Sequence, residues 1–544
     1  MPKHGSLFIR CTPESATRYA VLRPGMMFAS TPLTLAWTQP TMTATDTTAD
    51  KLKRQQYRTL DRRQLNSLQL GKLNRLLDSL TDHPLYRKPL SKIRLPLQSL
   101  DELNQFPLLT KSDLAGPPPQ PTNHPGSPRS NGDSPPLFSR PPESYVRYHQ
   151  TSGSRGWPMP ILDTRADWNW WIQCWQYVLD AADVDANDIA MMAFSFGPFI
   201  GFWSANDALV HRGTLVVPGG GLTTLARLHL IQQRRCTVLC CTPTYALHMA
   251  SVASQNNIDL SRNDVSRIIV AGEPGGSVPS VRNAIQSQWG ARVIDHAGAS
   301  EIGAWGFASE DHSGLHVIES EFIAEFLIFD SNGNYRPAQP LTAQPLTAQP
   351  LTAQPVSTQT VSSQSIPTQP ALNQPISKGS SEELAGESSG NDQSILIGER
   401  SELVITNLGR DGGPVVRYRT GDIVTPVWDH SLTCRFVHLP GGVLGRADDM
   451  LVIRGVNVFP SSVEAIVRQT EPTAEFRMIA SEVDSMDQLR IELEVPPESD
   501  SVAKLEQLLR QRLALRVPVT CVPVGSLPRS EAKSKRWIDE RKPI

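Results

Sequence analysis

The sequence has few cysteines, few aromatic residues and almost no excess charge of either sign. Its 544 residues include seven cysteines and 6% aromatic residues, and the formal net charge at pH 7 is -2. The cysteines are scattered, odd in number and never spaced as CxxC. This argues against a disulfide framework or a structural zinc site and favours a reducing cytoplasm. A near-neutral chain gives no support for bulk binding to nucleic acid or to a membrane surface.

Long apolar runs are also missing. The most apolar stretch, FSFGPFIGFW at 194–203, has half of the roughly 20 residues that a bilayer span needs, so we expect no membrane span. Its aromatic residues fit either the buried core or an apolar ligand pocket: Phe194, Phe196, Phe199, Phe202 and Trp203.

Three segments have the composition of unfolded chain. Residues 1–52 are poor in large apolar residues, which predicts a disordered or mis-called N-terminal extension; they contain no clear signal peptide. Residues 115–140 are dense in Pro, Gly and Ser and predict a flexible loop. Residues 336–394 begin with a repeated AQPLT unit, and a proline in every repeat prevents a strand ladder or a packed helix. We expect a low-complexity insertion there and not a solenoid, whose repeats have 20 or more residues.

The rest of the chain alternates between apolar strands and helices. Leucines at three- and four-residue steps predict a helix at 64–80. Short apolar runs at 237–241, 267–272 and 292–298 predict buried strands, and therefore an α/β domain with a largely parallel sheet. A smaller α/β unit closes the chain, in which a helix should begin near Ser461 with Ser461 or Ser462 as its N-cap.

Several polar segments have residue types that suit a nucleotide. The loop HQTSGSRGWP at 149–158 offers backbone N–H groups that suit an anion, although it is not a Walker A sequence. HAGASEIG at 296–303 puts Glu301 at the carboxyl end of a predicted strand, where ligands bind in α/β sheets and where a carboxylate can hold Mg²⁺. RYRTGDI at 417–423 puts Asp422 in a glycine-containing turn, where its carboxylate can accept hydrogen bonds from a ribose diol. Each segment alone also fits an ordinary solvated loop.

Taken together and in this order, the segments resemble one family. The chain looks like an adenylate-forming enzyme of the phenylacetate–CoA ligase type over roughly residues 55 to 541, apart from the two low-complexity segments. RYRTGD and GRADDMLVIRGVNVFPSSVE (445–464) are the most specific matches. The resemblance implies an α/β fold with a large AMP-binding domain at 53–446, built on mixed or parallel sheets with flanking helices. It also implies a small α+β lid at 447–544.

The resemblance further implies the residues that bind the nucleotide. The phosphate loop would be Thr151, Ser152, Gly153, Ser154, Arg155 and Gly156. Gly272, Glu273 and Pro274 would lie beside the adenine and the acyl group. Ser300 would lie near the phosphates with Glu301 on Mg²⁺, Asp422 would bind the ribose, and Arg446 would hold ribose or phosphate.

In the lid, the resemblance implies that Asp448 is the hinge and that Lys533 is the catalytic lysine. Gly455 would begin a loop that faces the pantetheine of coenzyme A. The chain departs from the family pattern at three points. Ser154–Trp157 replaces Thr-Thr-Gly-Lys, Ala297 replaces an aromatic residue, and Ala532 replaces the glycine before the lysine. Lys535 is therefore an alternative to Lys533.

The implied activity is ATP-dependent activation of a carboxylic acid through an acyl-adenylate, followed by transfer to coenzyme A. The aromatic run at 194–203 would suit an aryl or arylacetic acid. Two alternatives stay open: an adenylyltransferase that acts on a hydroxyl acceptor such as a deazaflavin, and a catalytically impaired nucleotide-binding homologue. The expected partners are the acid, ATP, Mg²⁺ and coenzyme A, with no nucleic acid and no membrane span, and a homodimer is left open.

Overall fold

The computed structural model describes the chain from residue 46 to residue 541 with several gaps. The described residues are 46–115, 135–151, 158–198, 200–330, 334–338, 340–341, 396–429, 433–447, 449, 451–453, 456–483, 486–513, 515–529 and 536–541. They belong to a compact unit that begins at Thr45. The residues 1–45 of the expected N-terminal extension lie outside the described part.

Four helices begin the described chain: α1 (Thr48–Arg58), α2 (Arg62–Ser79), α3 (Arg87–Leu90) and α4 (Lys111–Ala115). The helix predicted at 64–80 is confirmed as α2, whose buried face includes Leu65, Leu73 and Leu77. The expected boundary at residue 53 is wrong, because α1 already begins at Thr48. Thr47 caps this helix through a capping box with Asp50.

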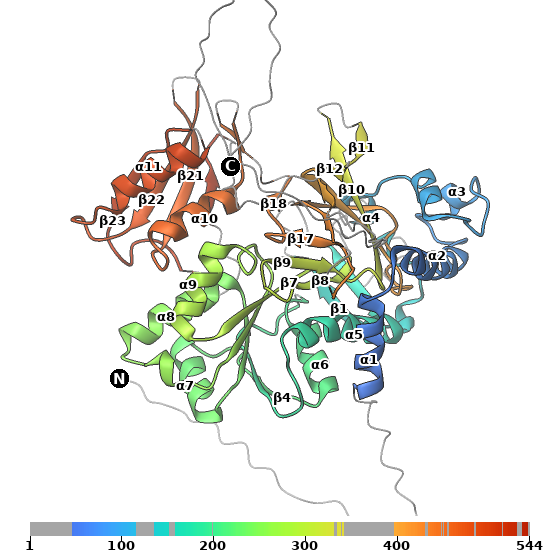
Figure 1. Ribbon diagram of the computed structural model, residues 1–544, viewed down its shortest axis with the longest axis horizontal. Helices are drawn as coiled ribbons and strands as arrows, with labels where there is room; N and C mark the ends of the chain where they lie inside the picture. Colours follow the sequence, from blue (N-terminus) through green and yellow to red (C-terminus); the bar gives the residue numbers. More distant parts are fainter. Residues whose placement is uncertain are drawn as a thin grey trace, which may run out of the picture. The chain divides into compact units, whose positions relative to one another are not determined.

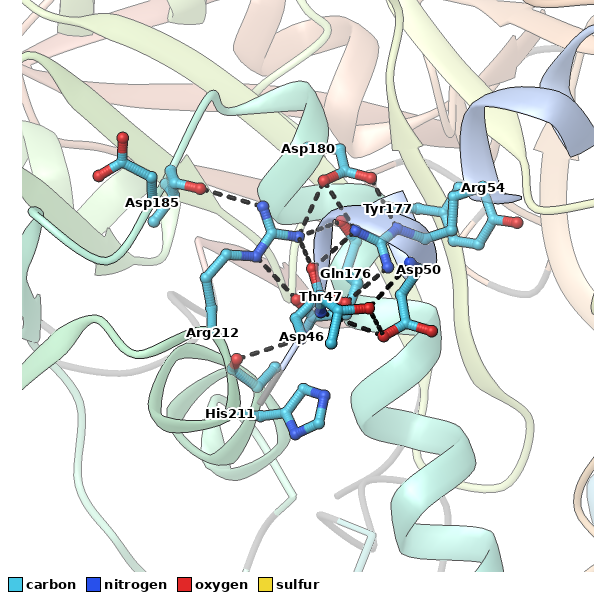
Figure 2. A network of polar contacts seen from close by, with 12 residues as sticks. Asp46, Thr47, Asp50, Arg54, Gln176, Tyr177, Asp180, Asp185, His211 and Arg212 are labelled. Atoms are coloured by element: carbon cyan, nitrogen blue, oxygen red, sulfur yellow. Dashed lines mark hydrogen bonds and ion pairs between the residues drawn. The ribbon is translucent and has the colours of Figure 1, made fainter. Parts of the chain in front are cut away.

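A buried network of ion pairs holds α1 against α5 (Arg165–Ala181) and α6 (Trp203–Arg212), as Figure 2 shows. Arg54 lies 2.8 Å from Asp46 and 2.7 Å from Asp180, and Arg212 lies 2.8 Å from Asp180. The four side chains are only 4% to 6% exposed. Removing one of these charges would leave the remaining buried charges unbalanced, so α1 is an integral part of the domain.

The main sheet has eleven strands in the order β12-β13-β16-β17-β9-β8-β7-β6-β5-β3-β4. Figure 1 labels its strands β12, β17, β9, β8, β7 and β4. The strands from β7 to β4 are parallel, as expected, but the other strands pair antiparallel. The sheet is therefore mixed, and the expectation of a largely parallel sheet holds only for this part. The parallel strands are β3 (Ile189–Met192), β4 (Leu215–Pro218), β5 (Val238–Cys241), β6 (Arg267–Val270) and β7 (Arg292–Ala299). Helices α7 (Thr224–Arg234), α8 (Pro243–Gln255) and α9 (Pro279–Trp289) alternate with them.

The antiparallel part of the main sheet leads into a second, five-stranded sheet. The antiparallel strands are β8 (Gly303–Ala308), β9 (Gly314–Val317), β12 (Pro340–Leu341), β13 (Leu396–Gly398), β16 (Val427–Trp428) and β17 (His438–Pro440). The second sheet has the order β11-β10-β14-β15-β18. Its strands are β10 (Phe322–Phe329), β11 (Tyr335–Pro337), β14 (Ser401–Asn407), β15 (Tyr418–Val424) and β18 (Gly445–Arg446).

These strands change two expectations. Residues 336–337 and 340–341 belong to β11 and β12, so the ordered chain continues beyond the expected start of the insertion at residue 336. Residues 342–395 lie outside the described part. Asp422, expected in a turn, lies inside β15, where Gly421 takes a φ of 76° within the strand.

The expected loop at 115–140 also changes at its end. Residues 116–134 lie outside the described part, but Leu137 and Phe138 are buried, with exposures of 0% and 4%. The backbone oxygen of Leu137 lies 3.3 Å from His83 Nε2. The end of this proline-rich segment is therefore part of the core.

The C-terminal part has its own hydrophobic core. Its elements are β19 (Leu451–Ile453), β20 (Val456–Val458), α10 (Pro460–Thr470), β21 (Phe476–Val483), β22 (Met486–Glu494), α11 (Ser501–Leu513), β23 (Val519–Val522) and β24 (Trp537–Asp539). Four of the strands form a sheet in the order β23-β22-β21-β24. Figure 1 labels β21, β22 and β23 beside α10 and α11. The expected fold class, a large α/β part followed by a small α+β part, is confirmed.

The predicted cap of α10 is wrong. Phe459 is its N-cap residue, Pro460 occupies the first helical position, and no side chain caps the helix. Ser461 Oγ instead donates to the backbone oxygen of Leu444, at 2.5 Å. Proline suits the first turn because it has no N–H to satisfy. Within the described residues, no helix is both long and apolar enough to span a bilayer.

Candidate active site

The parallel strands end at one edge of the main sheet, and the polar segments predicted from the sequence follow them there. Gly272–Pro274 follows β6 and Ser300–Glu301 follows β7. The aromatic segment that begins at Phe194 follows β3. Because carboxyl ends of parallel strands share an edge, these segments form the usual ligand-binding side of an α/β sheet.

Glu301 is a buried carboxylate that is held from the second sheet. It is 8% exposed, and the Tyr418 hydroxyl donates to its Oε1 at 2.8 Å. Burial and the Glu301 charge raise the pKa of Tyr418 well above its usual value, so Tyr418 stays a donor. Oε2 makes no hydrogen bond with the residues that the structure describes. One oxygen is therefore fixed in place while the other is available to a ligand.

Arg410 holds the backbone on which Glu301 is carried. Its Nη1 donates to the carbonyl oxygens of Ser300 at 3.1 Å and Glu301 at 2.8 Å. Its Nε donates to Asp163 at 2.8 Å, and both side chains of this pair are 0% exposed. The sequence analysis missed Arg410, because an arginine in a polar, glycine-rich segment such as LGRDGG usually lies on the surface.

Asp422 and Arg446 are direct cross-strand partners on β15 and β18. Their side chains form an ion pair at 2.9 Å. The charges of Glu301, Arg446 and Asp422 all act on the Tyr418 hydroxyl. The structure thus brings three predicted residues, Glu301, Asp422 and Arg446, into one neighbourhood around Tyr418.

Thr151 marks the base of the predicted phosphate loop. It follows β1 (Tyr145–Gln150), which pairs with β2 (Pro160–Thr164). Thr151 N donates to Met159 O and Met159 N donates to Thr151 Oγ1, both at 3.0 Å. These bonds close the two ends of the loop on each other. The loop residues Ser152, Gly153, Ser154, Arg155 and Gly156 lie outside the described part.

Glu273 lies at the edge of the main sheet, just after β6. It accepts from Thr244 N at 2.8 Å and from Thr244 Oγ1 at 2.5 Å, at the start of α8. Burial raises the pKa of Glu273, and the nearby charges of Glu464 and Arg536 act on it in opposite directions. Arg536 in turn donates to Glu464 at 3.1 Å. Gly272 has a φ of 94°, which favours glycine, and Pro274 is half-buried.

The aromatic segment at 194–203 lies partly in the core and partly at the edge of the main sheet. Phe202 is 4% exposed, whereas Phe194, Phe196 and Trp203 are half-buried. Their rings form a continuous row, with centroids 5.3 Å apart for Phe194–Phe202, 4.5 Å for Phe194–Phe196 and 4.7 Å for Phe196–Trp203. Phe199 lies outside the described residues.

Three further predicted residues, Asp448, Gly455 and Lys533, also lie outside the described part, as does the alternative Lys535. Ala297, which replaces the family's aromatic residue, is half-buried opposite Gly306 of β8. Among the residues that the structure does describe, no three His, Cys, Asp or Glu side chains form a group that could hold a metal by themselves.

Known proteins are similar to this chain in fold and in sequence. Residues 455–541 match the family model of the AMP-binding enzyme C-terminal domain. The phenylacetate-coenzyme A ligase of Thermus thermophilus is 25% identical over 515 residues, which cover 89% of this chain and 98% of that enzyme. The phenylacetate-coenzyme A ligase of Escherichia coli is 25% identical over 496 residues, 88% of this chain and 95% of that enzyme.

A solved structure supports the fold. The crystal structure of 2-hydroxyisobutyryl-CoA ligase, in the postadenylation state with R3-HIB-AMP, has a TM-score of 0.69 at 20% identity. The match covers 89% of this chain and 92% of that one. The fold is that of the adenylate-forming enzymes. Within this class, the chain is similar in sequence to phenylacetate-coenzyme A ligases, and its C-terminal part matches the AMP-binding enzyme C-terminal domain.

Proposed function

We propose that the protein is an AMP-forming acid–thiol ligase that activates a carboxylic acid with ATP and transfers the acyl group to coenzyme A. The observation that carries this proposal is the meeting of Glu301, Asp422 and Arg446 around the Tyr418 hydroxyl. Glu301 follows β7 at the carboxyl edge of the parallel strands, where α/β enzymes bind nucleotides, and Asp422 and Arg446 lie on β15 and β18 of the second sheet. The ligase activities of the phenylacetate-coenzyme A ligases to which the chain is similar support it.

The proposed nucleotide site runs along this edge. The loop Thr151–Gly156 would receive the ATP phosphates through backbone N–H groups, with Arg155 adding positive charge. Asp422 would accept hydrogen bonds from the ribose, and Arg446 would bind ribose or phosphate. Gly272–Pro274 would lie beside the adenine, and Ser300 beside the phosphates. The bonds between Thr151 and Met159 support the loop assignment, because they fix the ends of a short loop that leads away from β1.

Glu301 is suited to bind Mg²⁺. Oxygen ligands are what this ion prefers, and the carboxylate has one oxygen held by Tyr418 and another without a hydrogen bond to the described residues. A site with a single protein carboxylate agrees with the usual binding of Mg²⁺, in which phosphates and waters complete the coordination. When bound, the ion would neutralise phosphate charge.

The chemistry has two steps. A carboxylate oxygen of the acid attacks the α-phosphorus of ATP, the bond to the β-phosphate oxygen breaks, and acyl-adenylate and pyrophosphate form. The protein positions the two reactants and Lys533 stabilises negative charge on the phosphates. The thiol of coenzyme A, having lost its proton, then attacks the acyl carbon and AMP leaves.

The lid, proposed to comprise residues 447–544, would move about Asp448 between these steps. That motion would remove Lys533 and present the loop that begins at Gly455 to the pantetheine arm. The contact of Arg536 with Glu464, and the effect of both charges on Glu273, support an approach of this part to the sheet edge. The six free cysteines among the described residues agree with a proposed cytoplasmic location.

ATP–pyrophosphate exchange with benzoate, phenylacetate and medium-chain acids tests the proposal. We expect exchange that depends on both the acid and Mg²⁺, and formation of AMP and an acyl-CoA when coenzyme A is added. AMP joined to a hydroxyl acceptor would favour the adenylyltransferase instead. ATP binding without turnover for any acid would contradict the enzyme assignment.

A further inference from the structure

His296 is a buried side chain to which the proposed chemistry gives no role. It lies on β7, five residues before Glu301, and is 7% exposed. Its ring centroid is 4.2 Å from that of Trp175, which in turn lies 6.2 Å from Phe202. His296 therefore joins the row of aromatic rings that follows β3. Burial lowers the pKa of His296 to about 4, so the ring is neutral at neutral pH.

One ring nitrogen of His296 is occupied and the other is not. Nδ1 lies 2.7 Å from the backbone oxygen of Gly306. Because a carbonyl oxygen only accepts, Nδ1 must carry the proton, and Nε2 of the neutral ring is left as an acceptor. Nε2 makes no hydrogen bond with the residues that the structure describes. Nε2 is therefore an acceptor that a bound ligand could use.

The residue that would cover Nε2 is a glycine. Gly298 lies two positions further along β7, on the same face, and it is exposed. A Cβ at Gly298 would lie 2.9 Å from the backbone oxygen of Gly303, which is too close, and 3.4 Å from His296 Nε2, in van der Waals contact with it. The approach of β8 therefore requires glycine here, and the glycine also leaves Nε2 uncovered on this side. The missing side chain leaves this nitrogen open at the end of the strand that leads to Ser300 and Glu301.

We propose that His296 is a specificity-determining residue, and that the acid bound here carries a hydrogen-bond donor, a hydroxyl or amino group, on its aromatic body. The inference rests on the proposed function and names its substrate class. The donor pairs with Nε2 while the aromatic rings contact the apolar part of the acid. An acid that lacks the donor leaves Nε2 unpaired. An acid that carries an ether oxygen at the same place brings a second acceptor towards the lone pair of Nε2, which is unfavourable.

Matched acids test this inference on the full-length protein. Benzoate and phenylacetate are compared with their ring isomers that carry a hydroxyl, an amino or a methoxy group, in ATP–pyrophosphate exchange. For at least one position we expect the hydroxy or amino acid to exceed the parent acid about 10- to 100-fold in kcat/KM, and the methoxy acid not to exceed it. The His296→Phe variant, which keeps an aromatic ring without the acceptor, should bring this ratio close to one.

His316 provides a matched control. It is also a buried histidine whose Nδ1 lies 3.0 Å from a backbone oxygen, that of Phe436, but it lies on β9. His316→Phe should keep the wild-type ratio. Should His296→Phe not fold, calorimetric titration of the wild-type protein with paired acyl-sulfamoyl adenosines, with and without the hydroxyl, measures the same preference.

The outcomes separate the two proposals. Acid-dependent exchange without any preference for a donor, or a preference that survives in His296→Phe, overturns the role of His296 and leaves the ligase assignment standing. Absence of exchange with every acid overturns the proposed function, and this inference with it.

Discussion

Tyr418 on β15 donates a hydrogen bond of 2.8 Å to Glu301, which follows β7, although 117 positions separate the two residues in the chain. This bond joins the second sheet to the main sheet at the proposed metal ligand. The strand that carries Tyr418 also carries Asp422. One strand therefore supplies both the carboxylate proposed for the ribose and the group that orients the carboxylate proposed for Mg²⁺.

Replacing Tyr418 with phenylalanine should weaken metal binding, because Glu301 loses the bond that fixes its side chain. We expect the Mg²⁺ concentration for half-maximal pyrophosphate exchange to rise about 3- to 10-fold, in line with the loss of one hydrogen bond to a charged group. Mn²⁺ binding in the presence of ATP, followed by electron paramagnetic resonance, should weaken equally. Tyr177→Phe is the control, since it removes a buried hydroxyl bonded to Ser320 Oγ at 2.8 Å. Equal shifts in both variants would contradict the orienting role.

Asp422→Asn should raise the KM for ATP about 10-fold or more, because the variant loses a charged acceptor for the ribose and leaves Arg446 without its carboxylate. Steady-state exchange at varied ATP measures the change. Glu492→Gln is the matched control. Glu492 also pairs with an arginine on the neighbouring antiparallel strand, with 2.5 Å between its Oε2 and Arg477 Nη2. The KM for ATP in the control should equal that of the wild type. An unchanged KM in Asp422→Asn would remove Asp422 from the proposed site.

Asp180→Ala should destabilise the large domain by about 3–5 kcal/mol, because it leaves Arg54 and Arg212 buried with a single remaining carboxylate, Asp46. Urea unfolding followed by tryptophan fluorescence measures the loss. Asp264→Ala, which removes an exposed ion pair with Arg235, should leave the unfolding midpoint unchanged. If Asp180→Ala unfolds at the wild-type urea concentration, α1 is not anchored by this network.

His316 should make the protein less stable in mild acid. Burial lowers the pKa of His316 to about 4, below its ordinary value of 6.5. The unfolded chain therefore binds a proton that the folded protein excludes. The stability from this group is complete above pH 6.5 and is lost as the pH falls towards 4, by about 1.4 kcal/mol per pH unit at most. Urea unfolding between pH 7 and pH 5 should show a smaller loss for His316→Phe than for the wild type. An identical loss would mean that His316 is protonated in the folded protein.

Lys533→Ala should nearly abolish acyl-adenylate formation while preserving thioester formation from a preformed acyl-adenylate, because the lysine acts on the phosphates of ATP only. Lys535→Ala is the control and should keep both partial reactions near the wild-type rates. The opposite pattern would assign the catalytic role to Lys535.

Much of the fold could be predicted from the spacing of apolar residues, because helices and strands form between neighbours in the chain. The leucine spacing found α2, and the apolar runs found β5, β6 and β7. Boundaries were less predictable. Asp46 and Thr48 look like polar N-terminal residues. Their segment is nevertheless tied into the core by Arg54, which pairs with Asp180, 126 positions further along the chain. Likewise, serine is a good N-cap residue by composition, but Phe459 and Pro460 begin α10.

The sequence by itself determined the class of the protein and the identity of Glu301, Asp422 and Arg446 as candidate ligands, because their motifs are short and contiguous. Only the tertiary structure decided that Tyr418 and Arg410 hold Glu301 in place and that His296 keeps an open acceptor beside a glycine. The physical reason is that a hydrogen bond depends on which distant strands and loops meet. That depends on how the whole chain packs, and no local pattern records it.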